Sequence, residues 1–336
     1  MTAFVSSPKY VEHGTGPHHP ERPDRIRAIH RAVRAAGLID SPDPFPEFKL
    51  DLGDMPRAPH KLLEIAPTPA DEEWVYLVHR PEHVRTIKRV CELGGGVLDQ
   101  GDTPVEANGF EMALLSLGAV LTACDAVMTG RATRAFAAGR PPGHHAEPGR
   151  AMGFCLFSNI AIGARYLQRK YGVKKVAIVD FDVHHGNGTQ ACLEDDPTVF
   201  FVSMHEDPRT CYPGSGYDWE SGVGPGVGYT MNVPFPPGSG DDAYLAALTD
   251  KVIPALDAFD PEVLMISAGF DAHLDDPLAH IELSEGGFEQ MTRELVALAN
   301  RHCQGRIIST LEGGYDLRAL GRSVVQHLIA LGGNDK

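Results

Sequence analysis

The chain has 336 residues, enough for one large domain or two smaller ones. With 43% hydrophobic and 22% charged residues, its composition excludes a disordered chain, a collagen-like chain and a disulfide-stapled mini-protein. Thirty Lys and Arg against 45 Asp and Glu give a net charge of −15, which disfavours nucleic acid as a direct partner but tolerates a cationic substrate.

Helical and strand patterns alternate along the chain. Residues 23–36 predict a helix closed by Gly37, and from about residue 110 short β-branched runs alternate with apolar stripes of helical spacing. This alternation is typical of a parallel sheet covered by helices. The expected strands are 134–138, 175–180, 199–204, 263–267 and 306–311, and the expected helical stripes are 114–128, 245–259 and 288–298. Because no repeat or flexible linker divides the chain, we expect one α/β domain over residues 1–336.

The cysteines and the first residues indicate the compartment. The six cysteines are dispersed and include no C-x-x-C pair, so neither a disulfide framework nor a structural thiolate zinc site is expected. The N-terminus lacks a basic region followed by an apolar run, and about 18 uninterrupted apolar residues occur nowhere. We therefore expect a cytoplasmic protein that neither spans a membrane nor is exported.

The sharpest motif is V-D-F-D-V-H-H-G-N-G at 179–188, at the end of an expected strand. Ligands of open α/β sheets bind at the carboxyl ends of strands. Alternation along an extended chain would place Asp180, Asp182 and His184 on one side, and carboxylate with imidazole suits Zn²⁺ or Fe²⁺. Asp271, in S-A-G-F-D-A-H, follows another expected strand and offers a third ligand. Each segment alone is equally compatible with caps and turns, but the two together favour a metal site.

A site made of Asp182, His184 and Asp271 has three protein ligands and an open position, which is the catalytic pattern. Its two carboxylates offset the charge of a divalent ion, so a bound water is acidified less than at an all-imidazole site. Neighbouring groups must therefore assist proton transfer and stabilise oxyanion charge.

Two further motifs supply such groups. R-P-P-G-H-H-A at 140–146 carries His144 and His145, of which one can stay neutral as a base while a carboxylate holds the other. L-E-G-G-Y-D at 311–316 allows the backbone to bend and bring Tyr315 inward as an oxyanion donor, although a buried structural tyrosine is the alternative. The other histidines considered are expected mainly in loops or on the surface: His18, His19, His79 and His83.

With these segments in this order, the chain resembles the histone deacetylase family of the arginase–deacetylase fold, and is most similar to its class II and bacterial deacetylase-like amidohydrolases. The further matching segments are H-G-T-G-P-H-H-P-E-R-P-D-R at 13–25, G-F-C-L-F-S-N at 153–159, Y-P-G-S-G at 212–216 and E-G-G-Y at 312–315. The resemblance implies a single domain with a central, mainly parallel sheet of about eight strands flanked by helices.

The resemblance also implies zinc-dependent amide hydrolysis by a metal-activated water. The implied zinc ligands are Asp182, His184 and Asp271. His145 would act as general base and then as acid for the leaving amine, and His144, paired with Asp180, would orient water and stabilise charge. Tyr315 would donate to the tetrahedral oxyanion. Many members carry Asp where this chain has Asn187, whereas the class II branch resembles this chain in having Asn. A neutral partner should keep His145 less basic.

The substrate site and a second cation site also follow from the resemblance. Phe154 and Tyr212 would form the walls of a narrow acyl-lysine tunnel, Gly153 would accept from the substrate amide, and Asp102 would grip the substrate backbone at the rim. A buried monovalent-cation site, taking K⁺, would be formed by Asp180, Ser203 and backbone carbonyls around Asp182, His184 and Met204.

One position bears on the choice of substrate. Polyamine-specific relatives carry an acidic residue seven positions after the last metal-binding aspartate, whereas this chain has Leu278. A carboxylate would be expected there if a second substrate ammonium had to be recognised. We therefore rank an acylated lysine side chain of a protein or peptide above an acetylated polyamine or other small acetylated amine.

Other classes of function remain as alternatives. A non-catalytic acyl-peptide-binding module would have lost the oxyanion donor or a dyad histidine, but Tyr315, His144 and His145 are all present. A binuclear arginase-like ureohydrolase would need additional bridging Asp or His ligands. The sequence leaves homo-oligomer formation open.

Overall fold

Short, mostly apolar and fully buried runs form the central strands, as expected for a sheet covered on both faces. The computed structural model describes residues 1–99 and 101–333. Within these ranges, eight strands form one sheet in the order β2-β1-β5-β10-β9-β6-β7-β8, and each neighbouring pair is parallel. The strands are β1 (Thr2–Ser6), β2 (Leu63–Ile65), β5 (Arg134–Ala138), β6 (Val176–Asp180), β7 (Val199–Glu206), β8 (Thr230–Phe235), β9 (Val263–Ala268) and β10 (Ile307–Leu311).

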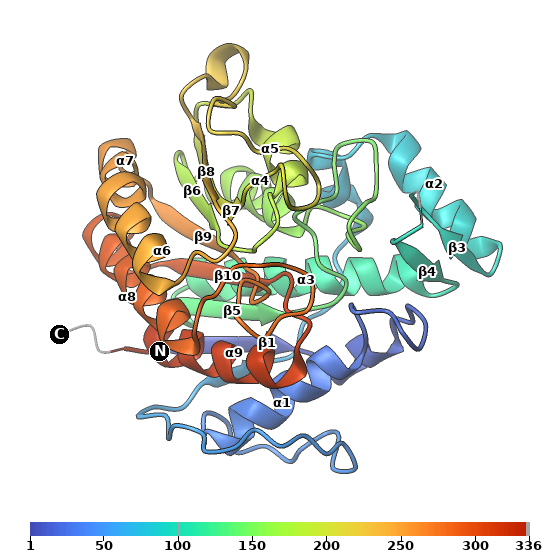
Figure 1. Ribbon diagram of the computed structural model, residues 1–336. Coiled ribbons are helices and arrows are strands. Elements are labelled where there is room, and N and C mark those ends of the chain that lie inside the picture. The colour runs from blue at the N-terminus through green and yellow to red at the C-terminus, as the bar shows by residue number, and fades with distance from the viewer. Residues whose placement is uncertain (100, 334–336) are drawn as a thin grey trace.

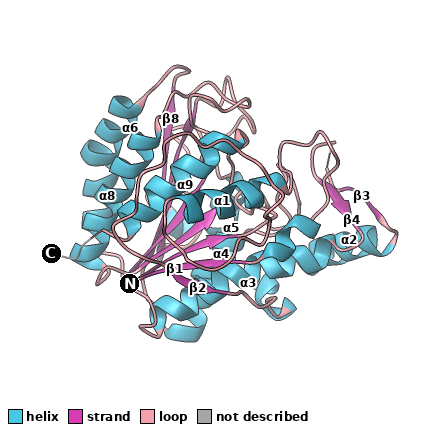
Figure 2. Ribbon diagram, turned by 90° about the horizontal axis from the view of Figure 1, so that it is seen from below, coloured by secondary structure: helices cyan, strands magenta, loops and turns pink. Residues whose placement is uncertain are grey.

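Helices cover both faces of this sheet (Figures 1 and 2). One layer contains α1 (Asp24–Ala35), α6 (Asp241–Ala247), η4 (Leu248–Val252), α7 (Ile253–Phe259), α8 (Glu285–His302) and α9 (Leu317–Leu331). The other contains α3 (Gly109–Met128), α4 (Asn159–Tyr171) and α5 (Asn187–Leu193). At one end of the molecule, α2 (Pro81–Glu92) packs on a small hairpin of β3 (Gly95–Val97) and β4 (Pro104–Glu106). Short 3₁₀ turns are η1 (Pro8–Glu12), η2 (Glu72–Leu77) and η3 (Gly224–Gly226).

The single α/β domain with a parallel eight-stranded sheet is confirmed by this architecture. The last three residues of the predicted domain, 334–336, lie outside the described residues. The strands β5, β6, β7, β9 and β10 lie where the sequence predicts them, and the stripe at 245–259 forms one helical run through α6, η4 and α7. The helix predicted at 23–36 is α1, and Gly37 after it has φ +74°.

Helix α3 lies within the hydrophobic core. By length and composition alone it could cross a membrane, but 72% of its most apolar window is buried inside the molecule. It packs on β1, β5 and β10 and against α4. A core helix of a layered α/β protein accounts for this burial.

The parallel strands all end at the same edge of the sheet, which positions the site. The loops that follow β5, β6, β9 and β10 carry the four sequence motifs. In the sheet, β10 lies between β5 and β9, and β6 is next to β9. Segments more than 100 residues apart in the sequence therefore meet at one edge.

Candidate active site

The metal-ligand candidates gather at the ends of β6 and β9. One ligand atom each from Asp182, His184 and Asp271 lies within 4.8 Å of the others, and all three side chains are buried. His184 Nδ1 is 3.1 Å from Asp182 Oδ1 and 3.2 Å from Asp271 Oδ2. The predicted triad therefore forms a compact cluster.

Turn hydrogen bonds, rather than a longer strand, form this cluster. Strand β6 ends at Asp180, so the extended conformation expected through His184 does not persist. Instead, the Asp182 amide donates to Asp180 Oδ1 at 3.0 Å, and the His184 amide donates to Asp182 Oδ1 at 2.9 Å. The Val183 amide donates to Asp271 Oδ1 at 3.0 Å, which ties the β6 loop to the β9 loop.

The cluster fits a divalent cation. Asp271 Oδ2 is buried without a hydrogen bond, so one carboxylate oxygen is available as a ligand. Burial disfavours a charged imidazole, yet the adjacent carboxylates of Asp182 and Asp271 raise the pKa of His184 well above its ordinary value. Positive charge is therefore favoured at this point. A Cβ on Gly313 would lie 1.9 Å from Asp271 Oδ2, so only glycine allows the backbone to close over the site.

His144 and His145 lie beside this cluster, in the loop after β5. Their ring centroids are 3.9 Å apart, and His144 Nδ1 is 3.0 Å from Asp180 Oδ2. Burial opposes protonation of His144, but the charges of Asp182 and Asp180 raise its pKa to about 10.

His145 has the opposite environment. Its Nδ1 is 2.7 Å from Asn187 Oδ1. Burial lowers the pKa of His145 well below its ordinary value, and the charge of His144 lowers it further. The hydrogen bond to Asn187 acts in the opposite direction, so the lowered pKa of His145 comes from burial and the neighbouring histidines and not from the amide. The two imidazoles thus differ strongly in proton affinity.

Glu312 lies in the motif at 311–316, but the sequence pattern alone assigns it no role. This buried carboxylate accepts hydrogen bonds from the amides of Gly143 at 2.7 Å and His144 at 3.1 Å, and from Ser267 Oγ at 3.0 Å. Glu312 therefore fixes the backbone of the histidine loop to β9 and β10. A glutamate directly after a buried strand was the available signal.

Tyr315 lies at the same end of the pocket, 8% exposed. The Tyr315 amide donates to Asp276 Oδ2 at 2.7 Å, and the Arg25 guanidinium lies 5.1 Å from the centre of its ring. Neither Asp276 nor Arg25 was singled out from the sequence. Gly314, with φ +120°, provides the bend expected before the tyrosine.

The predicted substrate residues line one pocket of about 210 Å³ together with His145, His184 and Tyr315. Its remaining lining residues are Asp102, Gly153, Phe154, Tyr212 and Leu278. Gly153 and Phe154 have φ of +55° and +69°, an uncommon conformation for phenylalanine. A Cβ on Gly153 would lie 2.4 Å from the His145 ring, which explains the glycine.

The rim of the pocket is tied to its wall. The Phe154 amide donates to Thr103 Oγ1 at 3.1 Å, and Thr103 in turn bonds to Asp99. Partial burial and the neighbouring Asp99 raise the pKa of Asp102 to about 6. His19, expected as a loop or surface residue, is half-buried and packs edge-on against Phe154 with ring centroids 4.6 Å apart. His18, by contrast, is exposed as expected.

The predicted monovalent-cation residues lie behind the site. Asp180 and Ser203 are paired in register on β6 and β7, and Met204 follows on β7, with all three side chains buried. Ser203 Oγ lies 2.8 Å from His205 Nδ1 and 3.4 Å from the Gly186 amide nitrogen.

His79 lies in the loop between η2 and α2, as expected, but the expectation that His83 lies in a loop or on the surface is wrong, because His83 is a buried residue of α2. The two histidines are only 3% and 4% exposed. His83 Nε2 lies 2.8 Å from the Leu156 carbonyl oxygen, and the Ser158 amide donates to His79 Nε2 at 2.8 Å. Both imidazoles satisfy backbone groups of the segment that follows Phe154, so they are structural.

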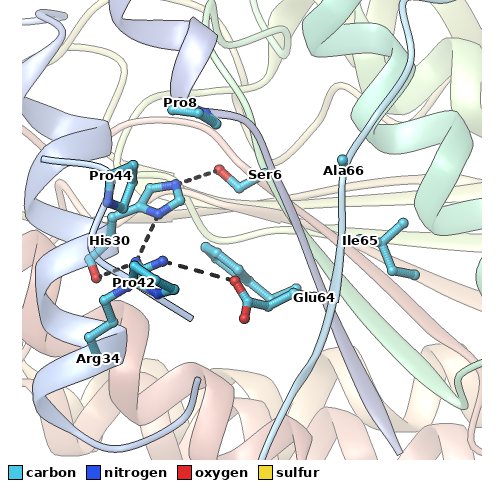
Figure 3. A pocket seen from close by; sticks show the side chains of 10 residues that line it. Ser6, Pro8, His30, Arg34, Pro42, Pro44, Glu64, Ile65 and Ala66 are labelled. Atoms are coloured by element: carbon cyan, nitrogen blue, oxygen red, sulfur yellow. Dashed lines mark hydrogen bonds and ion pairs between the residues drawn. The ribbon is translucent and has the colours of Figure 1, made fainter. Parts of the chain in front are cut away.

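A second cavity, of about 230 Å³, lies between α1 and strands β1 and β2 (Figure 3). His30 Nε2 lies 3.1 Å from Ser6 Oγ, and Arg34 lies 3.9 Å from Glu64. The Arg34 side chain also donates to the carbonyl oxygen of Ser41. These polar groups bond to one another, so the described residues of the cavity offer no unpaired polar group for a ligand. Within the described chain, none of the motif residues lines it.

Comparison with known proteins agrees with this geometry. A family model described as the histone deacetylase domain matches residues 19–331. A histone deacetylase-like amidohydrolase of Pseudomonas aeruginosa is 39% identical over 94% of this chain and 81% of its own, and a protein of Archaeoglobus fulgidus named "Probable deacetylase" is 37% identical over 94% and 82%. The solved HD domain of HDA15 superposes with a TM-score of 0.86, at 35% identity, over 98% of this chain and 89% of its own. The chain belongs to the histone deacetylase family.

Proposed function

We propose that the protein is a zinc-dependent deacetylase that removes acyl groups, acetyl foremost, from the side-chain amine of lysine in proteins or peptides. The observation that carries this proposal is the gathering of a carboxylate–imidazole triad, a histidine pair and a tyrosine at the inner end of one pocket. Family membership supports amide hydrolysis. The ligand triad supports zinc as the metal, and the residues that line the pocket support acyl-lysine as the substrate.

Asp182, His184 and Asp271 would hold the metal, and Fe²⁺ is the alternative that the same ligands suit. When bound, such an ion supplies Lewis acidity to the acyl carbonyl and lowers the pKa of water. His145 has the lowered pKa of a neutral base, so its Nε2 would take the proton of the attacking water and return it to the leaving amine.

The neighbouring groups would stabilise developing charge. His144, whose pKa is raised beside Asp180 and Asp182, would remain an imidazolium that orients the water. The Tyr315 hydroxyl would donate to the oxyanion of the tetrahedral state. Arg25, beneath the tyrosine ring, and Asp276, at its backbone, support its orientation.

The pocket wall favours a neutral, extended acyl-lysine chain. Phe154 and Tyr212 offer aromatic walls, Leu278 is apolar, and the Gly153 carbonyl would accept from the substrate amide. The carboxylate of Asp102 would accept from the substrate backbone at the rim. An acetylpolyamine is the second candidate, since the net charge of −15 suits a cation, but Leu278 offers no partner for a distal ammonium.

The proposal also includes a second bound cation and a cellular location. Asp180, Ser203 and the Met204 backbone would hold a structural K⁺, which their buried oxygen atoms suit. A reducing cytosol is the proposed location, because all six cysteines have free thiols.

The proposal is tested by the turnover of zinc-loaded protein on two matched panels, acyl-lysine peptides and acetylpolyamines. We expect a higher kcat/KM for acetyl-lysine peptides, with inhibition by a hydroxamate. A higher kcat/KM for acetylpolyamines would show that these, and not acyl-lysine peptides, are the preferred substrates. No hydrolysis in either panel would contradict the proposed function.

A further inference from the structure

A chain of hydrogen bonds runs from His145 out to the surface. Its first link joins His145 Nδ1 to Asn187 Oδ1 at 2.7 Å. Asn187 Nδ2 then donates to Glu147 Oε1 at 2.9 Å, and Arg150 Nη2 donates to the same oxygen at 3.1 Å. The buried base is thus connected, through a neutral amide, to a carboxylate that none of the roles above uses.

The carboxylate decides which way the amide points. An asparagine side chain has an acceptor end and a donor end of nearly equal shape, so its orientation follows from its partners. A carboxylate only accepts, so Glu147 requires the NH₂ group of Asn187. The other contact of that group is Met152 Sδ at 3.4 Å, a weak acceptor that cannot hold the orientation alone.

The orientation of the amide in turn selects the tautomer of His145. Because Asn187 presents its oxygen, Nδ1 of a neutral His145 must carry the proton. Nε2 then has a free lone pair. If the amide turned over, its NH₂ group would face Nδ1, the ring proton would move to Nε2, and the proposed base could not accept a proton there.

Glu147 is held firmly enough for this task. Its amide donates to the Arg150 carbonyl at 2.9 Å and the Arg150 amide donates back at 3.3 Å, which closes a tight turn through Pro148 and Gly149. The Glu147 carbonyl oxygen lies 3.0 Å from His79 Nδ1. This turn aligns the guanidinium of Arg150 with the carboxylate, and places Glu147 outside the residues that line the pocket.

We propose that Glu147, supported by Arg150, is a positioning residue that orients the Asn187 amide and thereby fixes His145 as the Nδ1–H tautomer. The consequence for turnover rests on the proposed function. The predicted tautomer does not rest on the proposed function, because it can be measured without substrate.

The first experiment measures that tautomer in zinc-loaded protein by ¹⁵N NMR of the histidine side chains. The parent should show a protonated Nδ1 and a free Nε2 at His145, and Glu147→Met should shift the population toward the Nε2–H form. Glu147→Gln, whose side-chain oxygen can still accept from Asn187, should restore the parent pattern. An unchanged tautomer in Glu147→Met would overturn the inference, whatever the enzyme hydrolyses.

The second experiment follows turnover. Glu147→Met should lower kcat about 10–100-fold, as expected for a group that orients an active-site histidine, with KM and bound zinc unchanged. Glu82→Met is the matched control: it also removes a carboxylate from an i,i+3 arginine pair, with Arg85, but on the exposed face of α2. It should leave kcat unchanged.

Repeating the Glu147 substitution in Asn187→Asp protein tells whether Glu147 acts by orienting the Asn187 amide or only by stabilising the structure. Asp at position 187 has two equivalent oxygens and needs no orienting partner. In Asn187→Asp protein, adding Glu147→Met should therefore cost less than about twofold in kcat. An equal loss in both backgrounds would assign Glu147 a merely structural role and overturn the inference.

Discussion

The inner end and the mouth of the pocket are built in different ways. At the inner end, Asp182, His184 and Tyr315 are at most 8% exposed. Asp182 accepts from the Gly313 amide of the β10 loop, and the Tyr315 amide donates to Asp276 of the β9 loop. At the mouth, Tyr212 and Leu278 are 40% and 38% exposed. Buried charges are stable only with partners, so the inner end tolerates little change, whereas the mouth can vary and so select the substrate.

The largest effect is expected at the metal-ligand cluster. Asp271→Ala removes the carboxylate whose Oδ2 has no hydrogen bond, so the protein should lose its metal and its turnover should fall to background. Elemental analysis of the purified variant measures this directly. Full metal occupancy in Asp271→Ala would reject the ligand set.

The next largest effect separates chemistry from metal binding at the same end of the pocket. Tyr315→Phe keeps the ring and the Asp276 anchor but removes the hydroxyl. We expect bound metal to be unchanged and kcat to fall about 10²–10³-fold, the loss typical of a missing oxyanion donor. Parent-like turnover would leave the phenol without a catalytic role.

At the mouth, a substitution should change selectivity rather than rate. Leu278→Glu places a carboxylate beside the pocket, where it can pair with a distal substrate ammonium. The ratio of kcat/KM for acetylpolyamines to that for acetyl-lysine peptides should rise about fivefold to tenfold, equivalent to about 1 kcal/mol. Leu274→Glu, on the same loop and 56% exposed, is the control and should not change the ratio. A ratio that also stays constant in Leu278→Glu would reject the gatekeeper argument.

The smallest effect is a pH dependence of binding at the rim. Partial burial and Asp99 raise the pKa of Asp102 to about 6, so its carboxylate is ionised above that pH and neutral below it. An acceptor for substrate amides is therefore weakened as the pH falls through about 6, and KM should rise about twofold to fivefold. Asp102→Asn should have the higher KM at every pH. A parent KM that is constant from pH 5 to 7.5 would contradict this role.

The sequence predicted the five consecutive strands from β5 to β7 in the sheet, but neither β1 nor the edge strands β2 and β8. Strands β5, β6, β9 and β10 are short, mostly apolar runs in which every residue is buried, and this is a strong local pattern. The edge strands β2 and β8 gave weak patterns, because β2 has three residues with a central Glu64 and β8 contains Pro234. Their positions depend on pairing with distant strands, which local patterns do not encode.

A similar division holds for the site. The motif residues that meet at the proposed site could be found from the sequence, because carboxylates and imidazoles after buried strands are unusual. The residues that position them were missed. Glu312, Asp276 and Glu147 act by accepting from amides of other loops, and such pairings between segments appear only when the loops are brought together.

We propose that one divalent ion, held by three buried side chains, supports hydrolysis of acyl-lysine. The most direct measurement is a titration of metal-free protein with Zn²⁺, following bound metal and release of acetate from an acetyl-lysine peptide together. Activity should rise in proportion to bound zinc and reach its plateau at one ion per chain. Full activity without metal, or a plateau that requires two ions per chain, would rule out catalysis by a single bound ion.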